Sequence, residues 1–334
     1  MKVLITGAFG NLGLSALHYL LKTDHLITCL DLHTKRNKKQ SRRFLKIKNF
    51  NIVWGDIRDV HFVVDAVNDQ DCIIHLSGLT PPITEINPEL AYSVNVTGTE
   101  NILKGIEKSS SDTRLIFASS FSTYGPQLPG AKPKTVKDTL VETDVYTSNK
   151  IEIEKLIRNS KISWIIFRIA ASPSLSLRNN QMDLLYDIPL DQQIDFIHPH
   201  DVGYALCKAV DLQMSNKIMN LGGGEKCHLI NREFLCRYFE ALGIGMLPDA
   251  AFRQPLEEKD WYYSSWLDSE EAQKLLKYQN HSFDDYLTEI KRNTGILAKF
   301  LRPLSPLIRK FLAKKSPYYT MHQSKDRIEN WEKN

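Results

Sequence analysis

Short apolar runs alternate along the chain with longer stretches in which apolar residues recur every three or four positions. The short runs are rich in β-branched side chains and cover residues 3–6, 26–31, 52–54, 72–76, 114–118 and 163–169. Continuous apolar strands separated by helical patterns indicate a parallel sheet with helices on both faces. The pattern therefore predicts an α/β fold built on a doubly wound parallel sheet.

The helical stretches are expected at residues 12–21, 59–67, 88–108, 146–159 and 200–213. After residue 169 the alternation becomes irregular, with a short strand expected at 194–198 and one more strand of the sheet at 217–221. Two further helices are expected to start near Asp268 and at Ser282, because serine and acidic residues satisfy the free N–H groups of a first helical turn. We expect the irregular part to form a smaller region beside the sheet.

The composition is that of a soluble globular protein, with 334 residues, 42% of them hydrophobic, and a net charge of +4. The five cysteines form no CxxC pair, so a reducing, cytoplasmic setting is expected. No apolar run approaches the roughly 18 to 20 residues that a membrane span requires, and the first residues are expected to form a strand instead of a signal peptide.

Positive charge is concentrated in two segments. Residues 35–48 hold eight basic residues and no acid. Because the net charge of the chain is small, nucleic-acid binding is not expected. Residues 295–334 form a basic amphipathic tail in which Pro303 and Pro306 are expected to interrupt the helix. Within it, residues 296–319 can rest on an anionic membrane surface, or they can pack on their own domain or on a second subunit.

A glycine-rich turn follows the first strand and opens the first helix. Gly7, Gly10 and Gly13 let the backbone approach a pyrophosphate, and the helix start offers free amides to that anion. A purely structural glycine turn is the alternative. Asp31 ends the second strand, where a carboxylate accepts hydrogen bonds from the adenosine ribose, which favours NAD over NADP. The basic residues at 35–43 could meet a 2′-phosphate, or they form a solvated helix face.

Two further turns lie at the carboxyl ends of strands, where ligands bind in open α/β sheets. Residues 55–57 follow the third strand and residues 76–78 follow the fourth. Asp56 is placed to accept a hydrogen bond from the adenine amine, or alternatively to cap the helix that starts near Asp59. His75, inside an apolar strand, is expected to be a hydrogen-bonded core residue.

Tyr146 and Lys150 stand one helical turn apart. An ammonium group at that spacing stabilises the phenolate and lowers the pKa of the tyrosine, which can then exchange a proton with a substrate hydroxyl. Ser120 closes the fifth strand at the same sheet edge and can hold the substrate oxygen. Ser119, Ser122 and Thr123 are competing hydroxyls.

In this order the motifs resemble the extended short-chain dehydrogenase/reductase (NAD-dependent epimerase/dehydratase) family over roughly residues 1–290. The resemblance rests on the glycine turn, Asp31, residues 55–57, 75–78 and 95–99, Ser119 and Ser120 with residues 124–125, Tyr146 with Lys150, Arg168, and residues 196–202 and 220–224. It implies that Tyr146 is the acid/base, that Lys150 binds the nicotinamide ribose and lowers the tyrosine pKa, and that Ser120 binds the reacting oxygen. Asn95 would help to organise the region of the lysine, or is a polar residue inside a helix.

The resemblance also implies a set of cofactor contacts and no metal site. The residues expected to contact NAD are Gly7, Phe9, Gly10, Asn11, Leu12, Gly13, Asp31, Asp56, Ile57, Leu76, Ser77, Gly78, Ala118, Ser119, Tyr146, Lys150 and Ile169. We expect a Rossmann-type NAD-binding domain at 1–168 and 196–223, and a substrate-binding region at 169–195 and 224–294. A homodimer acting on a small molecule is expected.

The substrate is less well specified by the sequence. Only 26 residues separate Arg168 from Asp195, and they lack the Asn and Tyr-Gly-Pro turn that the family's sugar-nucleotide enzymes place there. No Asp-Glu pair follows Ser120, which argues against sugar dehydration. Four aromatic residues could line a ring-binding pocket or belong to the core: Trp261, Tyr262, Tyr263 and Trp266. The favoured function is an NAD-dependent oxidoreductase, with a nucleotide-sugar 4-epimerase or a non-catalytic NAD-binding protein as alternatives.

Overall fold

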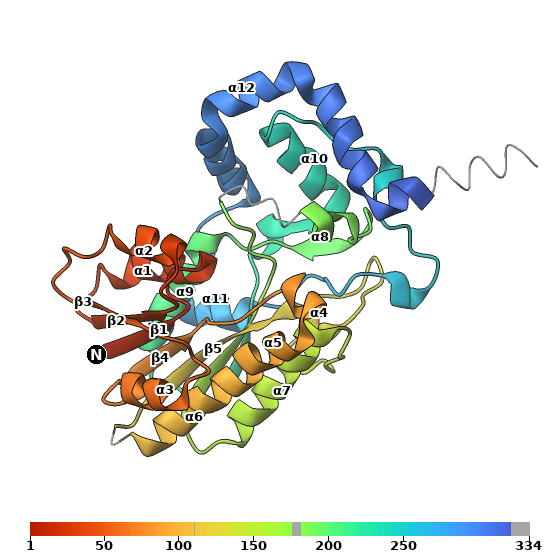
Figure 1. Cartoon of the computed structure of the whole chain (residues 1–334). Helices are drawn as coiled ribbons and strands as arrows, with labels where there is room; N and C mark the ends of the chain where they lie inside the picture. Colours follow the sequence, from red (N-terminus) through yellow and green to blue (C-terminus); the bar gives the residue numbers. More distant parts are fainter. Residues whose placement is uncertain (110, 176–181, 322–334) are drawn as a thin grey trace, which may run out of the picture.

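The computed structural model describes residues 1–109, 111–175 and 182–321. Seven parallel strands form one sheet in the order β3-β2-β1-β4-β5-β6-β8 (Figure 1). The strands are β1 (Lys2–Thr6), β2 (Leu26–Asp31), β3 (Phe50–Trp54), β4 (Cys72–His75), β5 (Arg114–Ser120), β6 (Ser163–Ile169) and β8 (Lys217–Leu221). Every apolar run named above forms one of these strands, so the predicted doubly wound parallel sheet is confirmed.

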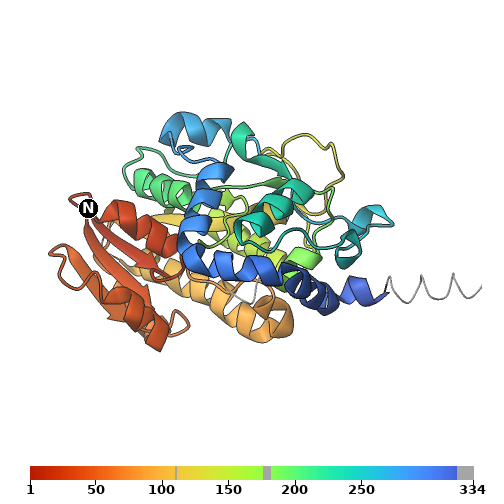
Figure 2. The ribbon, with the colours of Figure 1, turned by 90° about the horizontal axis from the view of Figure 1, so that it is seen from above.

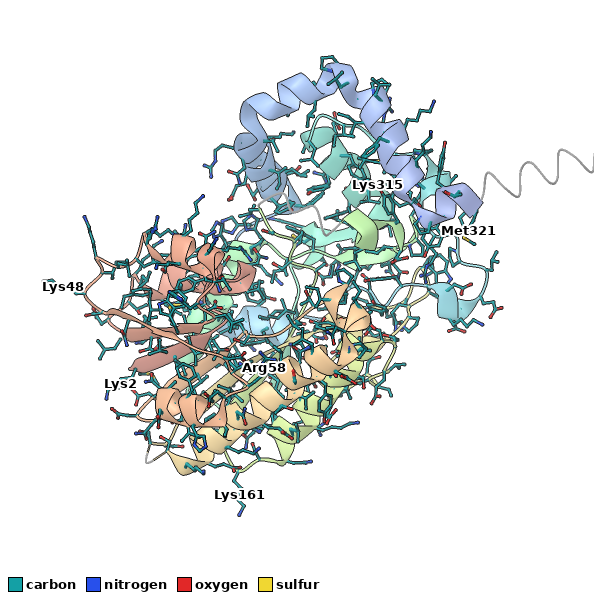
Figure 3. The ribbon with its side chains drawn as sticks, in the orientation of Figure 1. Lys2, Lys48, Arg58, Lys161, Lys315 and Met321 are labelled. Carbon is teal, nitrogen blue, oxygen red and sulfur yellow. The ribbon has the colours of Figure 1, made fainter. Side chains whose placement is uncertain are left out.

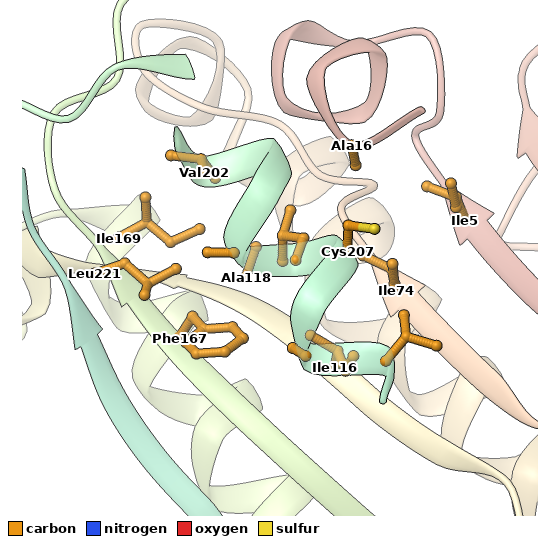
Figure 4. Packing of buried hydrophobic residues seen from close by; sticks show 14 of the residues in the cluster. Ile5, Ala16, Ile74, Ile116, Ala118, Phe167, Ile169, Val202, Cys207 and Leu221 are labelled. Atoms are coloured by element: carbon orange, nitrogen blue, oxygen red, sulfur yellow. The ribbon is translucent and has the colours of Figure 1, made fainter. Parts of the chain in front are cut away.

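Helices cover both faces of the sheet (Figure 1). One layer holds α1 (Asn11–Leu20), α9 (Pro199–Val210) and α11 (Glu270–Leu276), and the other holds α3 (Val60–Val67), α6 (Gly98–Lys108) and α7 (Val145–Asn159). Side chains alternate along each strand, so Ile5 and Ile116 lie in the same buried cluster as Val202 of α9 (Figure 4), whereas Leu4 and Leu115 pack on the opposite face. The basic run forms α2 (Lys35–Ser41), whose exposed side chains agree with a solvated helix face.

The carboxyl-terminal part adds a second, smaller core, in the upper part of Figure 1. Its elements are α8 (Met182–Tyr186), β7 (Gln193–Asp195), β9 (His228–Ile230), α10 (Asn231–Ala241) and α12 (Phe283–Lys315). β7 pairs with β9 in an antiparallel two-stranded sheet, so the strand expected at 194–198 starts one residue earlier and ends at Asp195. Seen from above in Figure 2, α12 lies across this part of the molecule.

The packing bears on the predicted division into domains. Leu267, Ala272, Leu276 and Tyr278 belong to the predicted substrate region at 224–294, but they pack in the core beneath the parallel sheet. Because α11 contacts both α9 and β8, this stretch belongs to one of the two helix layers that cover the sheet. Residues 176–181 of the predicted substrate region and 322–334 of the predicted tail lie outside the described residues.

Two predicted helices differ from the pattern in an informative way. The helix expected at 88–108 consists of α5 (Pro88–Tyr92), a π-helical turn (Ser93–Thr97) and α6. In the tail, the interruption expected at Pro303 and Pro306 is wrong, because α12 runs through both prolines. The break lies at Gly295, whose φ of 46° belongs to a backbone conformation that glycine adopts without steric cost. Ser282 caps this helix, as predicted.

Candidate active site

The predicted site residues meet at the carboxyl edge of the sheet because the strand ends are in register. Thr6 lies beside Leu30 on one side and His75 on the other. Ser120 lies beside Ile169 at the same edge. The turns that follow these strands therefore come together, although they are up to about 160 residues apart in the chain.

The glycine turn is shaped by close backbone approaches. Gly7 has a φ of 65°, and a Cβ atom there would lie 2.9 Å from the amide nitrogen of Ser77. A Cβ atom on Gly13 would lie 2.4 Å from the carbonyl oxygen of Gly7. Gly10 is the N-cap of α1, and no side chain caps this helix in the described part of the chain. The first amides of α1 are therefore free to bind an anion such as a phosphate.

The first turn of α1 also connects to the far side of the site. The side-chain amide of Asn11 donates a hydrogen bond to the carbonyl oxygen of Ser172, just after β6, at 3.1 Å. Leu12 is partly buried and packs against the core beside it. The turn is thus held between β4 and the segment that leaves β6.

Asp31 is fixed by three donors. One carboxylate oxygen accepts the amide of Phe9 at 2.8 Å, and the other accepts the amide of Leu32 at 2.8 Å and the side chain of Asn37 at 2.9 Å. Burial raises the pKa of Asp31, while the amides of Phe9 and Leu32 act in the opposite direction. The ring of Phe9 is buried against Trp54, while its backbone amide donates to Asp31.

Asp56 and Ile57 follow β3. The carboxylate of Asp56 binds the guanidinium of Arg58 through both oxygens, with distances of 2.5 to 3.0 Å, and this hydrogen bonding lowers the pKa of Asp56. Asp59, not Asp56, caps α3, so the alternative role of Asp56 as a helix cap is wrong. Ile57 is buried, and its carbonyl oxygen accepts the side chain of Asn101 on α6.

His75 is hydrogen-bonded on both sides within the core, as expected. Thr99 donates to the carbonyl oxygen of Asn95 at 2.6 Å, so its oxygen accepts from Nε2 of His75 at 3.0 Å. Nδ1 is then the acceptor for the hydroxyl of Thr6 at 2.6 Å. Burial lowers the pKa of His75 to about 3, so the ring is neutral.

Thr6 and Asn95 together hold the loop that follows β4. The hydroxyl of Thr6 accepts the amides of Leu76 and Ser77 at 3.2 and 3.1 Å. The side-chain amide of Asn95, in the π-helical turn, accepts the N–H of Leu79 at 2.7 Å and donates to its carbonyl at 3.1 Å. A Cβ atom on Gly78 would lie 3.2 Å from the Asn95 side-chain oxygen, so this loop passes close to it. Asn95 therefore shapes the backbone next to the site.

Ser120, Tyr146 and Lys150 are brought together by β5 and α7. Asp144 and Thr147 form a capping box that starts α7 at residue 145, which places Tyr146 in its first turn. The hydroxyl of Ser120 is hydrogen-bonded to the phenol of Tyr146, and it lies 2.8 Å from the hydroxyl of Ser122. Among the competing hydroxyls, Ser120 is thus the one that meets Tyr146.

The charge environment of the phenol differs from the expectation. Burial raises the pKa of Tyr146 to about 12, and the hydrogen bond from Ser120 acts in the opposite direction. The ammonium of Lys150 donates to the carbonyl oxygen of Ala118 at 2.6 Å, and it lies 4.6 Å from the Phe117 ring centroid and 5.8 Å from that of Tyr146. The expected lowering of the tyrosine pKa by Lys150 is therefore wrong for the protein alone. Burial lowers the pKa of Lys150 itself to about 8.

Comparison with known protein families and sequences shows what this chain is similar to. Residues 4–165 match the model of the 3-beta hydroxysteroid dehydrogenase/isomerase family. CDP-paratose 2-epimerase of Salmonella typhi is 30% identical over 129 residues, which cover 37% of this chain and 38% of that protein. D-erythronate dehydrogenase of Cupriavidus necator is 27% identical over 192 residues, which cover 53% of this chain and 56% of that protein. Over about half of its length or less, the chain is similar to members of the extended short-chain dehydrogenase/reductase family.

Solved structures show the same fold. UDP-glucuronic acid 4-epimerase from Bacillus cereus, in complex with UDP-glucuronic acid and NAD, aligns with a TM-score of 0.73 at 18% identity, over 89% of this chain and 100% of that chain. DesIV, a dTDP-glucose 4,6-dehydratase from Streptomyces venezuelae with NAD bound, aligns with a TM-score of 0.74 at 20% identity, over 91% and 100%. By contrast, the chain spans about half or less of the length of the two curated relatives it matches.

A buried ion pair joins β6 to α7 beside the candidate site. Arg168 on β6 binds Glu154 on α7 at 2.7 Å, and both side chains are almost fully buried. Glu154 also accepts the hydroxyl of Ser119 at 2.6 Å. Sequence reasoning missed Glu154. Its position four residues after Lys150, on the same face of α7, was a usable signal.

Glu85 is a second residue that the sequence did not indicate. Its carboxylate, on the short helix α4 (Ile83–Ile86), accepts the amides of Val145 and Tyr146 at 3.1 and 3.3 Å. Since a negative charge at a helix N-terminus is favourable, Glu85 fixes the start of α7 and with it the position of Tyr146. No periodicity or spacing relates Glu85 to Tyr146, which are 61 residues apart.

The predicted ring-binding aromatics border the start of α7. Tyr262 and Tyr263 are only partly buried, and their rings stack with centroids 4.1 Å apart. The Tyr263 hydroxyl hydrogen-bonds to Asp144, the N-cap of α7. Trp266, by contrast, stacks on His228 at 5.0 Å and donates to a backbone carbonyl. Among these predicted aromatics, Tyr263 is thus linked to the N-cap of α7.

The described residues contain no group of histidine, cysteine or acidic side chains that could hold a metal ion. All five cysteines, each within the described ranges, are free thiols, and four of them are buried. In the same residues, no helix is both long and apolar enough to traverse a bilayer.

Proposed function

We propose that this protein is an NAD-dependent oxidoreductase that transfers hydride between the nicotinamide and a substrate hydroxyl or carbonyl. One observation carries the proposal: the hydrogen-bonded hydroxyls of Ser120 and Tyr146 lie at the sheet edge that also holds the open N-terminus of α1. A proton-transfer group and an anion-binding turn at one edge are what hydride transfer from a dinucleotide requires.

The residues present fit a bound dinucleotide. The approaches of Gly7 to Ser77 and of Gly13 to Gly7 leave no room for side chains, so the backbone of the turn can meet a pyrophosphate. The Asp31 carboxylate faces the same turn through the amide of Phe9. When bound, NAD would accept or supply the hydride. Lys150, whose ammonium already donates to Ala118, would hold the nicotinamide ribose.

The chain's own groups account for the proton. With a pKa of about 12, Tyr146 is protonated at neutral pH and can donate its proton to a substrate carbonyl oxygen. In the oxidation direction the phenolate form accepts the hydroxyl proton, and with a pKa of about 12 that form becomes more abundant as the pH rises; Ser120 donates a hydrogen bond to the same oxygen. The positions of Ser120 and Tyr146 thus serve both directions of the reaction.

NAD is proposed over NADP. The carboxylate of Asp31 is held in place by three donors at the end of β2, where a 2′-phosphate would meet its negative charge. The neighbouring cation Arg36 is exposed and stabilises the charged form of Asp31. We also propose that residues 1–168 and 196–223 bind the cofactor and that residues 169–195 and 224–294 face the substrate.

A nucleotide-sugar 4-epimerase is the second candidate. It is favoured by the relatives, since CDP-paratose 2-epimerase and UDP-glucuronic acid 4-epimerase act on sugars carried by nucleotides. An epimerase returns the hydride to the substrate, so it gives an altered sugar without net nicotinamide reduction. A dehydrogenase gives stoichiometric reduced cofactor instead.

Three further features are proposed for the whole protein. A cytoplasmic location suits the buried free thiols, whose pKa values are raised by burial at Cys72 and Cys227. We also propose that two copies associate as a homodimer. Finally, residues 296–319 are proposed to touch a membrane surface at its periphery.

Calorimetry and a substrate panel test the proposed function. The purified chain should bind NAD⁺ more tightly than NADP⁺. A panel that sets nucleotide sugars beside lipophilic alcohols and ketones, followed by nicotinamide absorbance and by product analysis, then separates oxidoreductase from epimerase. Failure of the cofactor-free chain to bind either nucleotide would remove the proposal. Binding without turnover of any panel member would favour a non-catalytic NAD-binding protein.

A further inference from the structure

The carboxyl-terminal half of α12 has two unlike faces. On the inner face, Ala313 is buried in the second core, and the buried hydroxyl of Ser316 donates to the carbonyl oxygen of Ala251 at 2.6 Å. The Tyr186 hydroxyl donates to the carbonyl oxygen of Leu312 at 2.9 Å. This half of the helix is therefore fixed to the folded chain. That agrees with the predicted alternative in which the tail packs on its own domain.

The outer face carries an exposed apolar row. Leu304, Leu307 and Phe311 are 51%, 68% and 59% exposed. Their spacing of three and then four residues places them on one stripe of the helix, with Pro303 beside them. Large apolar side chains exposed in a row on one helix mark an interaction surface more often than scattered ones do.

Positive charge flanks this row. Lys310, Lys314 and Lys315 are exposed, and the ammonium of Lys315 lies 4.8 Å from the ring centroid of Phe311. Residues 295–321 contain no acidic side chain. Lys315 and Met321 mark this end of the molecule in Figure 3, whereas Lys161 marks the opposite end. The surface thus combines apolar groups with cations and has no counter-charge on its own segment.

We propose that this face docks on an anionic lipid bilayer, with Leu304, Leu307 and Phe311 at the boundary of headgroups and acyl chains and the lysines among the phosphates. Amphipathic helices with a basic flank bind in this way. The proposal deepens the peripheral contact proposed above and rests on it, but not on hydride transfer. Because contacts of the inner face already hold the helix in its folded form, the free energy of docking does not include the entropic cost of forming the helix.

A second copy of the chain fits this face poorly. A two-fold axis through it would bring the lysines of both copies against one another, which is repulsive. A standard dimer interface also buries about 800 Å² on each partner, of which three apolar side chains supply only a part. An anionic bilayer matches both the apolar row and the charge.

Co-sedimentation of the full chain with lipid vesicles tests the proposal. The chain should pellet with vesicles of phosphatidylcholine mixed with phosphatidylserine, should pellet much less with phosphatidylcholine alone, and should be released by salt. The variant with both Leu307→Glu and Phe311→Glu should lose about 100-fold of the binding, since burying each side chain is worth roughly tenfold. The variant with both Lys310→Glu and Lys314→Glu should lose at least about 25-fold, at about fivefold for each lost lysine.

Two control variants match these changes elsewhere on the surface. Lys161→Glu makes one such Lys-to-Glu change at the opposite end of the molecule, and Ile86→Glu makes one such apolar-to-acid change at a residue that is 77% exposed on α4. Both should pellet like the wild type, and all variants should keep the NAD affinity and melting temperature of the wild type.

The outcomes separate the two proposals. Equal pelleting of the wild type and the Leu307/Phe311 variant overturns the docking face, and so does equal binding to neutral and anionic vesicles. A shift of the same variant from dimer to monomer, with vesicle binding unchanged, would assign the face to a second copy. Vesicle binding by a chain that fails to bind NAD would leave the docking face standing and remove the oxidoreductase.

Discussion

The two cores of this molecule place their polar groups in different ways. In the sheet core, the groups with chemical potential stand at strand ends and in the turns that follow, so the register of β1, β4 and β5 brings Ser120, Thr6 and His75 to one edge. In the second core, polar side chains bridge backbone segments that no repeating pattern relates. The first kind of order can be read from a sequence, whereas the second cannot.

Gln192 illustrates the second kind. It is buried, and its side chain donates to the carbonyl oxygens of Gln127 and Ser264 at 3.0 and 2.8 Å while accepting the amide of Tyr262 at 2.9 Å. It therefore joins three loops at once. A glutamine in an irregular segment carries no sequence signal of such a role, since its partners are 65 to 72 residues away.

The sharpest test of the comparison is Tyr146→Phe in the sheet core. The ring remains but the proton donor is lost, so turnover on a substrate found in the panel should fall roughly 10²- to 10⁴-fold, with NAD binding retained. Steady-state kinetics measures the loss. Tyr92→Phe removes an exposed hydroxyl bound to Glu152 and is the control that should keep its turnover. Unchanged turnover of Tyr146→Phe would remove the assigned acid/base.

Glu154→Gln addresses what holds the sheet core together. It leaves Arg168 charged in a buried site, and the free energy of unfolding should fall by ~3–5 kcal/mol. Glu142→Gln is the matched control. Glu142 precedes α7 and pairs at 3.7 Å, on the surface, with Lys155, which follows Glu154 in that helix. That exposed pair should contribute less than ~1 kcal/mol. Urea unfolding of both variants measures the difference, and equal losses would contradict the assigned role of burial.

Gln192→Ala tests the second core. It leaves two carbonyl oxygens and one amide of three loops without their partner, so the free energy of unfolding should fall by ~1–3 kcal/mol. The exposed Gln213, which donates to the Asp211 carbonyl, offers Gln213→Ala as a control within ~0.5 kcal/mol of the wild type. Hydrogen exchange of Gln192→Ala should be faster than in the wild type mainly in the loops around residues 127 and 262. A loss spread evenly over the sheet would contradict the separation of the two cores.

The smallest effect concerns pH and involves one histidine in each core. Burial is the main cause that lowers the pKa of His75 and of His198 to about 3, below the ordinary value of about 6.5 for an unfolded chain. Between these values the unfolded state binds more protons, so stability is lost as the pH falls below about 6.5. At pH 5.5 each histidine should cost ~1.4 kcal/mol.

Chemical unfolding at pH 7 and 5.5 measures this loss. In the variant His198→Asn, the loss of unfolding free energy that these two histidines cause between pH 7 and 5.5 should fall by about half, because His75 of the sheet is still present. A pH dependence identical to that of the wild type would contradict the assignment to His198, which faces Glu289 at 3.8 Å and also interacts with the charges of His281, His200 and Asp285.

These differences explain how much of the molecule was predictable. The strands, the glycine turn and the pairing of Ser120 with Tyr146 follow from continuous apolar runs and from the residues at strand ends, and the family and fold comparisons agree with the fold. The pKa of Tyr146 was predicted in the wrong direction, because burial outweighs a lysine whose position in sequence says nothing about where its ammonium points. Glu85 was invisible because its link to α7 is purely spatial.

The tail shows the same limit. Proline signals predicted breaks at residues 303 and 306, but both prolines lie within α12 and the chain turns at Gly295. Packing of Ala313 and the bond from Ser316 hold the helix on the second core. Local propensity was overruled by tertiary contacts, which a sequence pattern does not contain.

The π-helical turn at Ser93–Thr97 has a consequence for how such a site arises and changes. An α-helix advances about 100° per residue, so one extra residue in a wide turn rotates everything beyond it by that angle without ending the helix. Tyr92, before the turn, reaches Glu152 of α7, whereas Asn101, beyond it, reaches the loop after β3. A single-residue insertion or deletion between residues 93 and 97 would therefore re-aim Asn95 and all of α6 together. This is a one-step route by which a gene can remodel both sides of a site.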